Sequence, residues 1–110
     1  CLKTTRLLVE NLNMKTPIIS TFQSRFGPDE WLQPYTDKTL QELPKEGKKK
    51  ILVICPGFAS DCVETLEEIS IQGKESFEES GGEKFDMIPC LNDNPDHIFL
   101  FEHLVKKYLV

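Results

Sequence analysis

The sequence has little of three things that would quickly assign a class: clustered positive charge, long apolar runs and paired cysteines. The formal net charge is −5, and the only basic run is 48–50. Nucleic-acid binding needs clustered Lys and Arg to contact phosphates, so we expect no nucleic-acid partner and interpret 48–50 as a solvated loop. The longest apolar run, 51–55, is far too short to cross a membrane.

The four cysteines are too widely spaced to form a familiar motif. None of them has CxxC spacing, which argues against a zinc ribbon or a thioredoxin-type site; they are Cys1, Cys55, Cys62 and Cys90. Cys55 ends the longest apolar run and is expected to be a small core residue. This usage fits a reducing, cytoplasmic location better than a disulfide framework.

Length and composition predict one small folded domain. The chain has 110 residues, of which 39% are hydrophobic and 28% charged, close to ordinary globular usage. It opens at Cys1 in the middle of a helical pattern, with Leu2, Leu8 and Leu12 already in place. We therefore expect it to be a piece of a longer protein.

The hydrophobic pattern predicts an α/β fold, a parallel sheet with flanking helices in the order α-β-α-β-α-β-α. The run 51–55 is apolar at every position, which is typical of a central strand covered on both faces. We expect strands at 18–22, 51–55 and 85–88, and helices at 2–13, from Thr36 to near Pro44, from Ser60 or Asp61 to Ser80, and at 96–109. The last helix is expected to bury Ile98, Phe101, Leu104, Val105 and Tyr108.

A long loop, 23–35, follows the first expected strand. Ligands of open parallel sheets bind beyond the carboxyl ends of the strands, and loops of this length are often functional. The alternative is a loop pinned to the core by its aromatics. The loop and its flanks contain side chains suited to a flat apolar ligand: Phe22, Phe26, Trp31, Leu32 and Tyr35.

An acidic cluster begins the helix after 51–55. Glu64 and Glu68 are four residues apart, so their carboxylates repel each other, and a cation or a proton would relieve that repulsion. A metal site would need a third ligand from elsewhere. The alternative is a capping box, with Asp61 as N-cap and Glu64 at N3. His97 and His103 lack the spacing of a helical zinc site, and no ligand role is expected for them.

Three motifs resemble those of ferrochelatases, in particular the proteobacterial members of the family. FQSRFGP at 22–28 and EWLQPYTD at 30–37 are similar to the family stretch FQSRxGxxxWLxPxTD. CPGFASDCVETLEE at 55–68 resembles the family motif that runs from a strand into an acidic helix, and PCLNDNP at 89–95 resembles a late loop. The resemblance spans essentially the whole chain.

The resemblance implies a two-lobed enzyme, a lyase that inserts ferrous iron into protoporphyrin IX in the last step of haem synthesis. Each lobe would be a Rossmann-like sheet, with porphyrin in the cleft between them. Residues 1–110 would be the C-terminal lobe, and the N-terminal lobe would lie outside this chain. By analogy Glu64 is the catalytic residue, Glu64 and Glu68 are metal ligands, and Gln72 replaces a residue that is often acidic. The substrate-binding residues implied are Gln23, Ser24, Phe26, Trp31 and Pro56.

The resemblance also sets what this chain would lack. The family's partner histidine lies upstream of Cys1, so the fragment alone is expected to be inactive or nearly so. No iron–sulfur cluster is expected, because no cysteines cluster near the C-terminus, and iron is a substrate rather than a cofactor. Contact with a membrane surface stays open. The alternatives are a chelatase for another tetrapyrrole, a non-catalytic tetrapyrrole-binding module, and a flavodoxin-like domain, which the lack of a phosphate loop disfavours.

Overall fold

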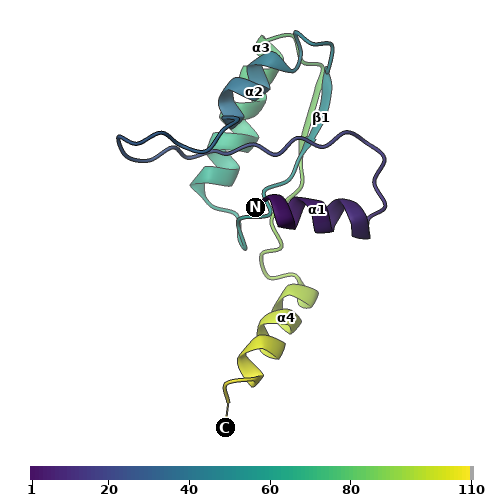
Figure 1. The fold of residues 1–110 in the computed structure, drawn as a ribbon, viewed down its shortest axis with the longest axis vertical. Helices are drawn as coiled ribbons and strands as arrows, with labels where there is room; N and C mark the ends of the chain where they lie inside the picture. Colours follow the sequence, from purple (N-terminus) through teal and green to yellow (C-terminus); the bar gives the residue numbers. More distant parts are fainter. Residues whose placement is uncertain (110) are drawn as a thin grey trace.

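The fold is a short parallel sheet with helices packed on one face, followed by a helix that projects away (Figure 1). The computed structural model describes residues 1–109. In chain order its elements are α1 (Leu2–Asn11), α2 (Thr36–Glu42), β1 (Lys50–Val53), η1 (Glu64–Gly73, a π-helix), α3 (Lys74–Glu79), β2 (Lys84–Met87) and α4 (Pro95–Lys106).

The two strands pair in parallel, with Lys50 opposite Lys84 and Val53 opposite Met87. The connection between them runs through η1 and α3, which follow one another without a break. This crossover returns the chain to the same end of the sheet, as parallel pairing requires. The predicted α/β class is therefore confirmed, although the expected single α-helix over this stretch begins with a π-helix.

A small apolar core lies between the sheet and the helices. Phe77 of α3 is fully buried, and its ring centroid lies 6.0 Å from that of Phe85 on β2. Gly82 lies against the Phe77 ring so closely that a Cβ there would come within 2.2 Å of ring carbons. The predicted burial of Cys55 is confirmed. The hydrophobic core cluster consists of Leu40, Leu43, Cys55, Ile69, Phe77 and Phe85.

The predicted strand at 18–22 is wrong. Only Phe22 pairs, through an isolated parallel bridge with Tyr35. The Phe22 N–H donates to Pro34 O (2.9 Å), and Phe22 O accepts from Thr36 N–H (3.0 Å). The backbone groups of Phe22 therefore close the base of the loop 23–35 instead of extending the sheet.

The prediction that both faces of 51–55 are covered is also wrong for this structure. Exposure alternates along β1, and Leu52 and Ile54 on the open face are 64% and 49% exposed. The helices cover the opposite face alone (Figure 1). An apolar run indicates that both faces of a strand are to be buried, but it does not show which segment packs on each face.

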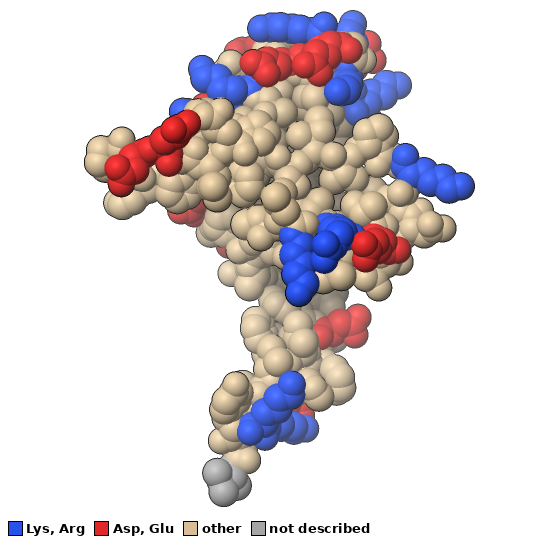
Figure 2. Space-filling view, viewed as in Figure 1, with Lys and Arg blue, Asp and Glu red and all other residues tan. Residues whose placement is uncertain are grey.

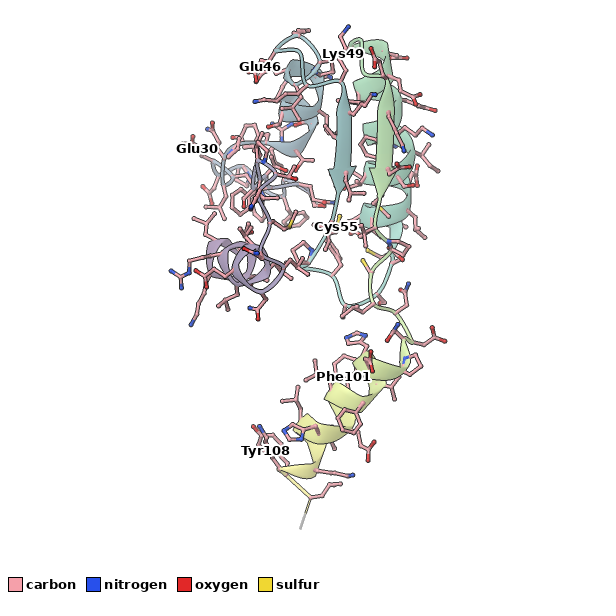
Figure 3. The ribbon with its side chains drawn as sticks, turned by 90° about the vertical axis from the view of Figure 1, so that its right-hand side faces the viewer. Glu30, Glu46, Lys49, Cys55, Phe101 and Tyr108 are labelled. Atoms are coloured by element: carbon pink, nitrogen blue, oxygen red, sulfur yellow. The ribbon has the colours of Figure 1, made fainter. Side chains whose placement is uncertain are left out.

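Helix α4 departs furthest from expectation. The five side chains predicted to be buried are all exposed, and His97 is the one buried residue of the helix. Figure 3 shows α4, with Phe101 and Tyr108 labelled, extending away from the other elements. The radius of gyration is 16.1 Å, above the roughly 13 Å expected for a compact chain of this size. The residues described here therefore include no surface that covers α4.

Charged side chains gather where the two strands begin, as the face in Figure 2 shows. Lys48 and Lys49 pair with Glu46 (3.2 Å) and Glu83 (4.0 Å), and all four are exposed. This agrees with a solvated basic run. Within residues 1–109 no helix has both the length and the apolarity needed to cross a membrane.

Candidate functional site

The candidate site lies where the loop 23–35 meets η1, beyond the carboxyl end of β1. The loop is closed at its base by the backbone bonds of Phe22. It is stiffened at its side by Arg25, whose guanidinium lies 2.9 Å from Asp37 Oδ2 and 4.3 Å from the centroid of the Tyr35 ring. The loop therefore leaves and returns at a fixed place on the sheet edge.

Two polar residues tie this loop to the acidic helix. Gln23 Nε2 donates to the backbone oxygen of Glu64 (2.8 Å). Ser24 donates twice to the Glu68 carboxylate, from its backbone N–H (3.1 Å) and from its hydroxyl (3.0 Å). Ser24 has a φ of 58°, in the left-handed region that few non-glycine residues adopt. The loop is thus held by hydrogen bonds across 41 and 44 residues of sequence.

The aromatic residues of the loop do not pin it to the core. Phe26 is 85% exposed, and Leu32 is also exposed. Trp31 contacts the loop itself, because its Nε1–H donates to Gln23 O (3.1 Å). The alternative of a loop held in place by buried aromatics is therefore wrong.

Glu64 is the half-buried first residue of η1. The Cys62 thiol and the backbone N–H of Glu64 itself lower the pKa of its carboxyl below the ordinary value, and partial burial opposes them. A carboxyl with a lowered pKa is ionised at neutral pH. The Glu64 side chain therefore presents a negative charge at the start of the helix.

The capping-box alternative for Glu64 is wrong. A capping box would need the Glu64 side chain to accept from the Asp61 N–H. That N–H donates instead to Asn92 Oδ1 (2.8 Å). The residue before η1 is Val63, which offers no side-chain cap.

The π-helical form of η1 changes how its acidic residues are presented. In a π-helix each N–H bonds to a carbonyl five residues back, as the Lys74 N–H does to Ile69 O. Residues four apart are then slightly less than one turn apart, so Glu64 and Glu68 lie near the same side. Periodicity alone predicted an α-helix here, and short π-helical segments are frequent at functional sites.

Glu68 borders a groove of about 550 Å³ between the loop, α2 and η1. Both of its oxygens accept from Ser24, so its orientation is fixed. Gln72 continues the row but donates to Glu67 Oε1 (3.4 Å). Within residues 1–109, no group of three or more His, Cys, Asp or Glu could hold a metal ion. A metal at Glu64 or Glu68 would therefore need further ligands from outside residues 1–109.

A smaller apolar cavity of about 230 Å³ lies between α1 and the carboxyl ends of the strands. Pro56, one of the predicted substrate-binding residues, lines it together with the two core-side thiols Cys55 and Cys90. Phe26 lines neither cavity. The structure thus brings together Gln23, Ser24, Trp31, Glu64 and Glu68, and it places Phe26 and Pro56 apart from them.

Asp61 joins the two turns at the carboxyl ends of the strands, a role the sequence did not reveal. Its carboxylate accepts from Thr65 Oγ1 (2.8 Å), Asn92 Nδ2 (2.9 Å) and the Cys90 N–H (3.2 Å). His97, equally unforeseen, places Nδ1 2.7 Å from Asn92 O. The resemblance of 89–95 to a family loop was the one signal that pointed to Asn92, and nothing in its spacing paired it with Asp61.

The Asp61 network predicts an acid-sensitive contribution to stability. The bonds from Asn92 first, and then from Thr65, lower the pKa of Asp61 in the folded protein. A lowered folded-state pKa stabilises the fold above the unfolded value of about 3.9, and this stabilisation is lost as the pH falls through the folded value. We expect Asp61→Asn to lower the urea midpoint at pH 7, and the gap from wild type to close below about pH 4. A difference in urea midpoint that does not change with pH would show that the charge of Asp61 does not contribute to stability.

The fold and site define an α/β unit with an acidic helix and a loop hydrogen-bonded to that helix near the carboxyl end of its sheet. The family model for ferrochelatase matches residues 1–109. The ferrochelatase of Allorhizobium ampelinum is 58% identical over 110 residues, and that of Rhizobium johnstonii is 59% identical; both matches cover 99% of this chain and 32% of the relative. The ferrochelatase of Vibrio cholerae is 56% identical over 107 residues, covering 96% of this chain and 33% of the relative.

The chain belongs to the ferrochelatase family. It spans about a third of the length of the curated relatives it matches. The resemblance read from the motifs is thereby confirmed.

Proposed function

We propose that this chain is the C-terminal lobe of a two-lobed ferrochelatase, which inserts ferrous iron into protoporphyrin IX to form protohaem. The observation that carries the proposal is the attachment of the loop 23–35 to the acidic helix. Gln23 holds the backbone of Glu64 and Ser24 holds the carboxylate of Glu68. A loop whose exposed aromatic rings suit a flat ligand is thus joined to carboxylates suited to a cation.

Metal insertion requires an ion to shed its water and the porphyrin to lose two pyrrole protons. Glu64 is ionised at neutral pH, so it can attract the ion and replace part of its hydration. The same ionised carboxylate can also accept a pyrrole proton, so metal delivery and proton acceptance are both proposed for Glu64. Glu68, one step along the same helix, would hold the ion on its way to Glu64.

The porphyrin would lie against the loop and the carboxyl end of β1. The proposed substrate-binding residues are Gln23, Ser24 and Trp31 beside the acidic helix, Phe26 on the exposed part of the loop, and Pro56 at the smaller apolar cavity. Trp31 and Phe26 expose apolar ring surface to a ligand. The exposed Phe26 and Leu32 also support, as a secondary proposal, a peripheral contact of this loop with a membrane.

The proposed partner of this chain is the N-terminal lobe of the same protein, which would also supply the missing histidine. The open face of β1 and the uncovered apolar residues of α4 support this, because apolar patches of this extent mark interaction surfaces. We place the protein in the cytoplasm, where its four free cysteines would stay reduced. We propose no resident cofactor or iron–sulfur cluster.

The proposal is tested by comparing the full-length protein with the 110-residue chain in a zinc-insertion assay that follows zinc-porphyrin fluorescence. We expect insertion by the full-length protein and a rate at least about 100-fold lower for the chain alone, because it would lack one of two metal-handling groups. Rapid insertion by the chain alone would contradict its assignment as half of a site.

Two further outcomes separate the alternatives. Full-length protein that binds protoporphyrin but inserts no metal would be a non-catalytic tetrapyrrole-binding module. Full-length protein that metallates sirohydrochlorin but not protoporphyrin would be a chelatase for another tetrapyrrole. Either result would replace the proposed function.

A further inference from the structure

Gln23 contacts three different parts of the site at once. Its Nε2 donates to Glu64 O on η1 (2.8 Å), and its Oε1 accepts from the Cys55 thiol just after β1 (3.9 Å). Its backbone oxygen accepts from the Trp31 Nε1–H across the loop (3.1 Å). The residue therefore connects the sheet, the acidic helix and the outer part of the loop.

The amide of Gln23 is fixed at its sheet end by a buried group. Cys55 belongs to the apolar core, and Figure 3 places it at the carboxyl end of β1. Burial foremost, and then the nearby Asp61, raise the pKa of the Cys55 thiol, so the sulfur keeps its proton and remains a donor. A donor at Oε1 leaves the NH₂ group to face Glu64.

The other end of the amide acts on the first peptide of η1. The carbonyl that Gln23 contacts belongs to Glu64 itself, so the bond restrains the orientation of that residue's backbone. The direction of a side chain follows from the orientation of its backbone. The position of the Gln23 amide therefore influences where the Glu64 carboxylate points.

We propose that Gln23 is a positioning residue that sets the direction of Glu64, and that Trp31 acts on Glu64 through Gln23. The inference rests on the proposed function and deepens it. Both polar ends of the half-buried Gln23 side chain are engaged by protein groups, so it acts through Glu64 even where it borders the substrate. A ring that displaced Trp31 would shift the Gln23 backbone and, through it, the catalytic carboxylate.

The first test is Gln23→Met in the full-length protein, assayed by zinc insertion. Methionine keeps the length of the side chain but removes the donor and the acceptor. We expect kcat to fall about tenfold, which corresponds to about 1.4 kcal/mol of barrier, while the KM for protoporphyrin changes less than about twofold. A raised KM with unchanged kcat would mean that Gln23 acts only through its contact with substrate, and it would overturn the positioning role.

The second test asks whether Trp31 acts through Gln23. Trp31→Phe keeps an aromatic ring but loses the Nε1–H, and we expect a kcat loss of roughly threefold, the scale of one modest hydrogen bond. The double variant should be no slower than Gln23→Met alone, because residues in one chain of contacts are not additive. If the kcat loss of the double variant equals the product of the two single losses, Trp31 does not act through Gln23 and the inference is overturned.

Gln33→Met provides a matched control in the same loop. Gln33 is exposed and donates to Glu30 (2.8 Å), so its loss should leave kcat and KM unchanged. Thermal midpoints of all variants identify general destabilisation. If Gln23→Met does not fold, Trp31→Phe decides alone, and an unchanged kcat would reject the inference. If Glu64→Gln abolishes insertion while Gln23→Met retains full kcat, this inference fails and the proposed function stands.

Discussion

Replacing Glu64 with glutamine in the full-length protein should lower the rate of zinc insertion by at least about a hundredfold, the scale on which a positioned proton-transfer or charged group contributes. Glutamine keeps the shape of the side chain and removes its charge. The backbone of Glu64 would still accept from Gln23, so the helix and loop should keep their contact. The loss should therefore appear in kcat more than in the KM for protoporphyrin.

Glu75→Gln provides the matched control for this experiment. Glu75 is exposed and lies in the first turn of α3. Its replacement by glutamine removes one negative charge from the same continuous helical segment, as Glu64→Gln does. It should insert zinc at the wild-type rate. Equal activity of wild type and Glu64→Gln would show that the carboxylate does not take part in the reaction, despite its lowered pKa and its place beside the loop.

Replacing Phe77 with alanine should lower the free energy of unfolding by about 3–5 kcal/mol. The side chain is fully buried against Phe85 and Gly82, so its loss leaves a cavity that rigid neighbours cannot fill. Domains have a net stability of only about 5–15 kcal/mol, so this one change would remove a large part of it.

Urea unfolding of the full-length protein, followed by circular dichroism, measures the effect of Phe77→Ala. Phe26→Ala removes the same side chain from a position that is 85% exposed, and it should cost less than about 1 kcal/mol. A cost below about 1 kcal/mol for Phe77→Ala as well would mean that the core can collapse around the missing ring.

The elements that local pattern predicted well are those whose cause is local. The strands expected at 51–55 and 85–88 correspond to β1 and β2, and the helix expected to end at Ser80 ends with α3 at Glu79. The strand expected at 18–22 did not form, because the pairing groups of Phe22 are used to close the loop. Helix α4 formed as expected, but the predicted burial of its apolar side chains was wrong, because no sequence window shows which surface covers a helix.

The sequence named part of the group that the structure brings together but not its contacts, and the predicted Phe26 and Pro56 lie apart from that group. The motifs pointed to Gln23, Ser24, Glu64 and Glu68, and the structure gathers all four. Ser24 donates to Glu68 across 44 residues, and Asn92 donates to Asp61 across 31 residues. Both hydrogen bonds depend on how the loops return to the edge of the sheet. Spacing along the chain contains no information about such pairings.

The π-helical stretch from Glu64 to Gly73 makes chain length, rather than residue type, the sensitive variable at this site. A π-helix contains one more residue per turn than an α-helix of the same path, so deleting one residue inside η1 would let the segment relax toward α-helical form. Everything on one side of the deletion would then rotate about the axis relative to the other. Glu64 and Glu68 would stay on one face, because residues three or four apart are neighbours on an α-helix, but the pair would turn relative to the residues beyond the deletion. We therefore expect this segment to tolerate substitutions at its exposed positions far better than the gain or loss of a single codon.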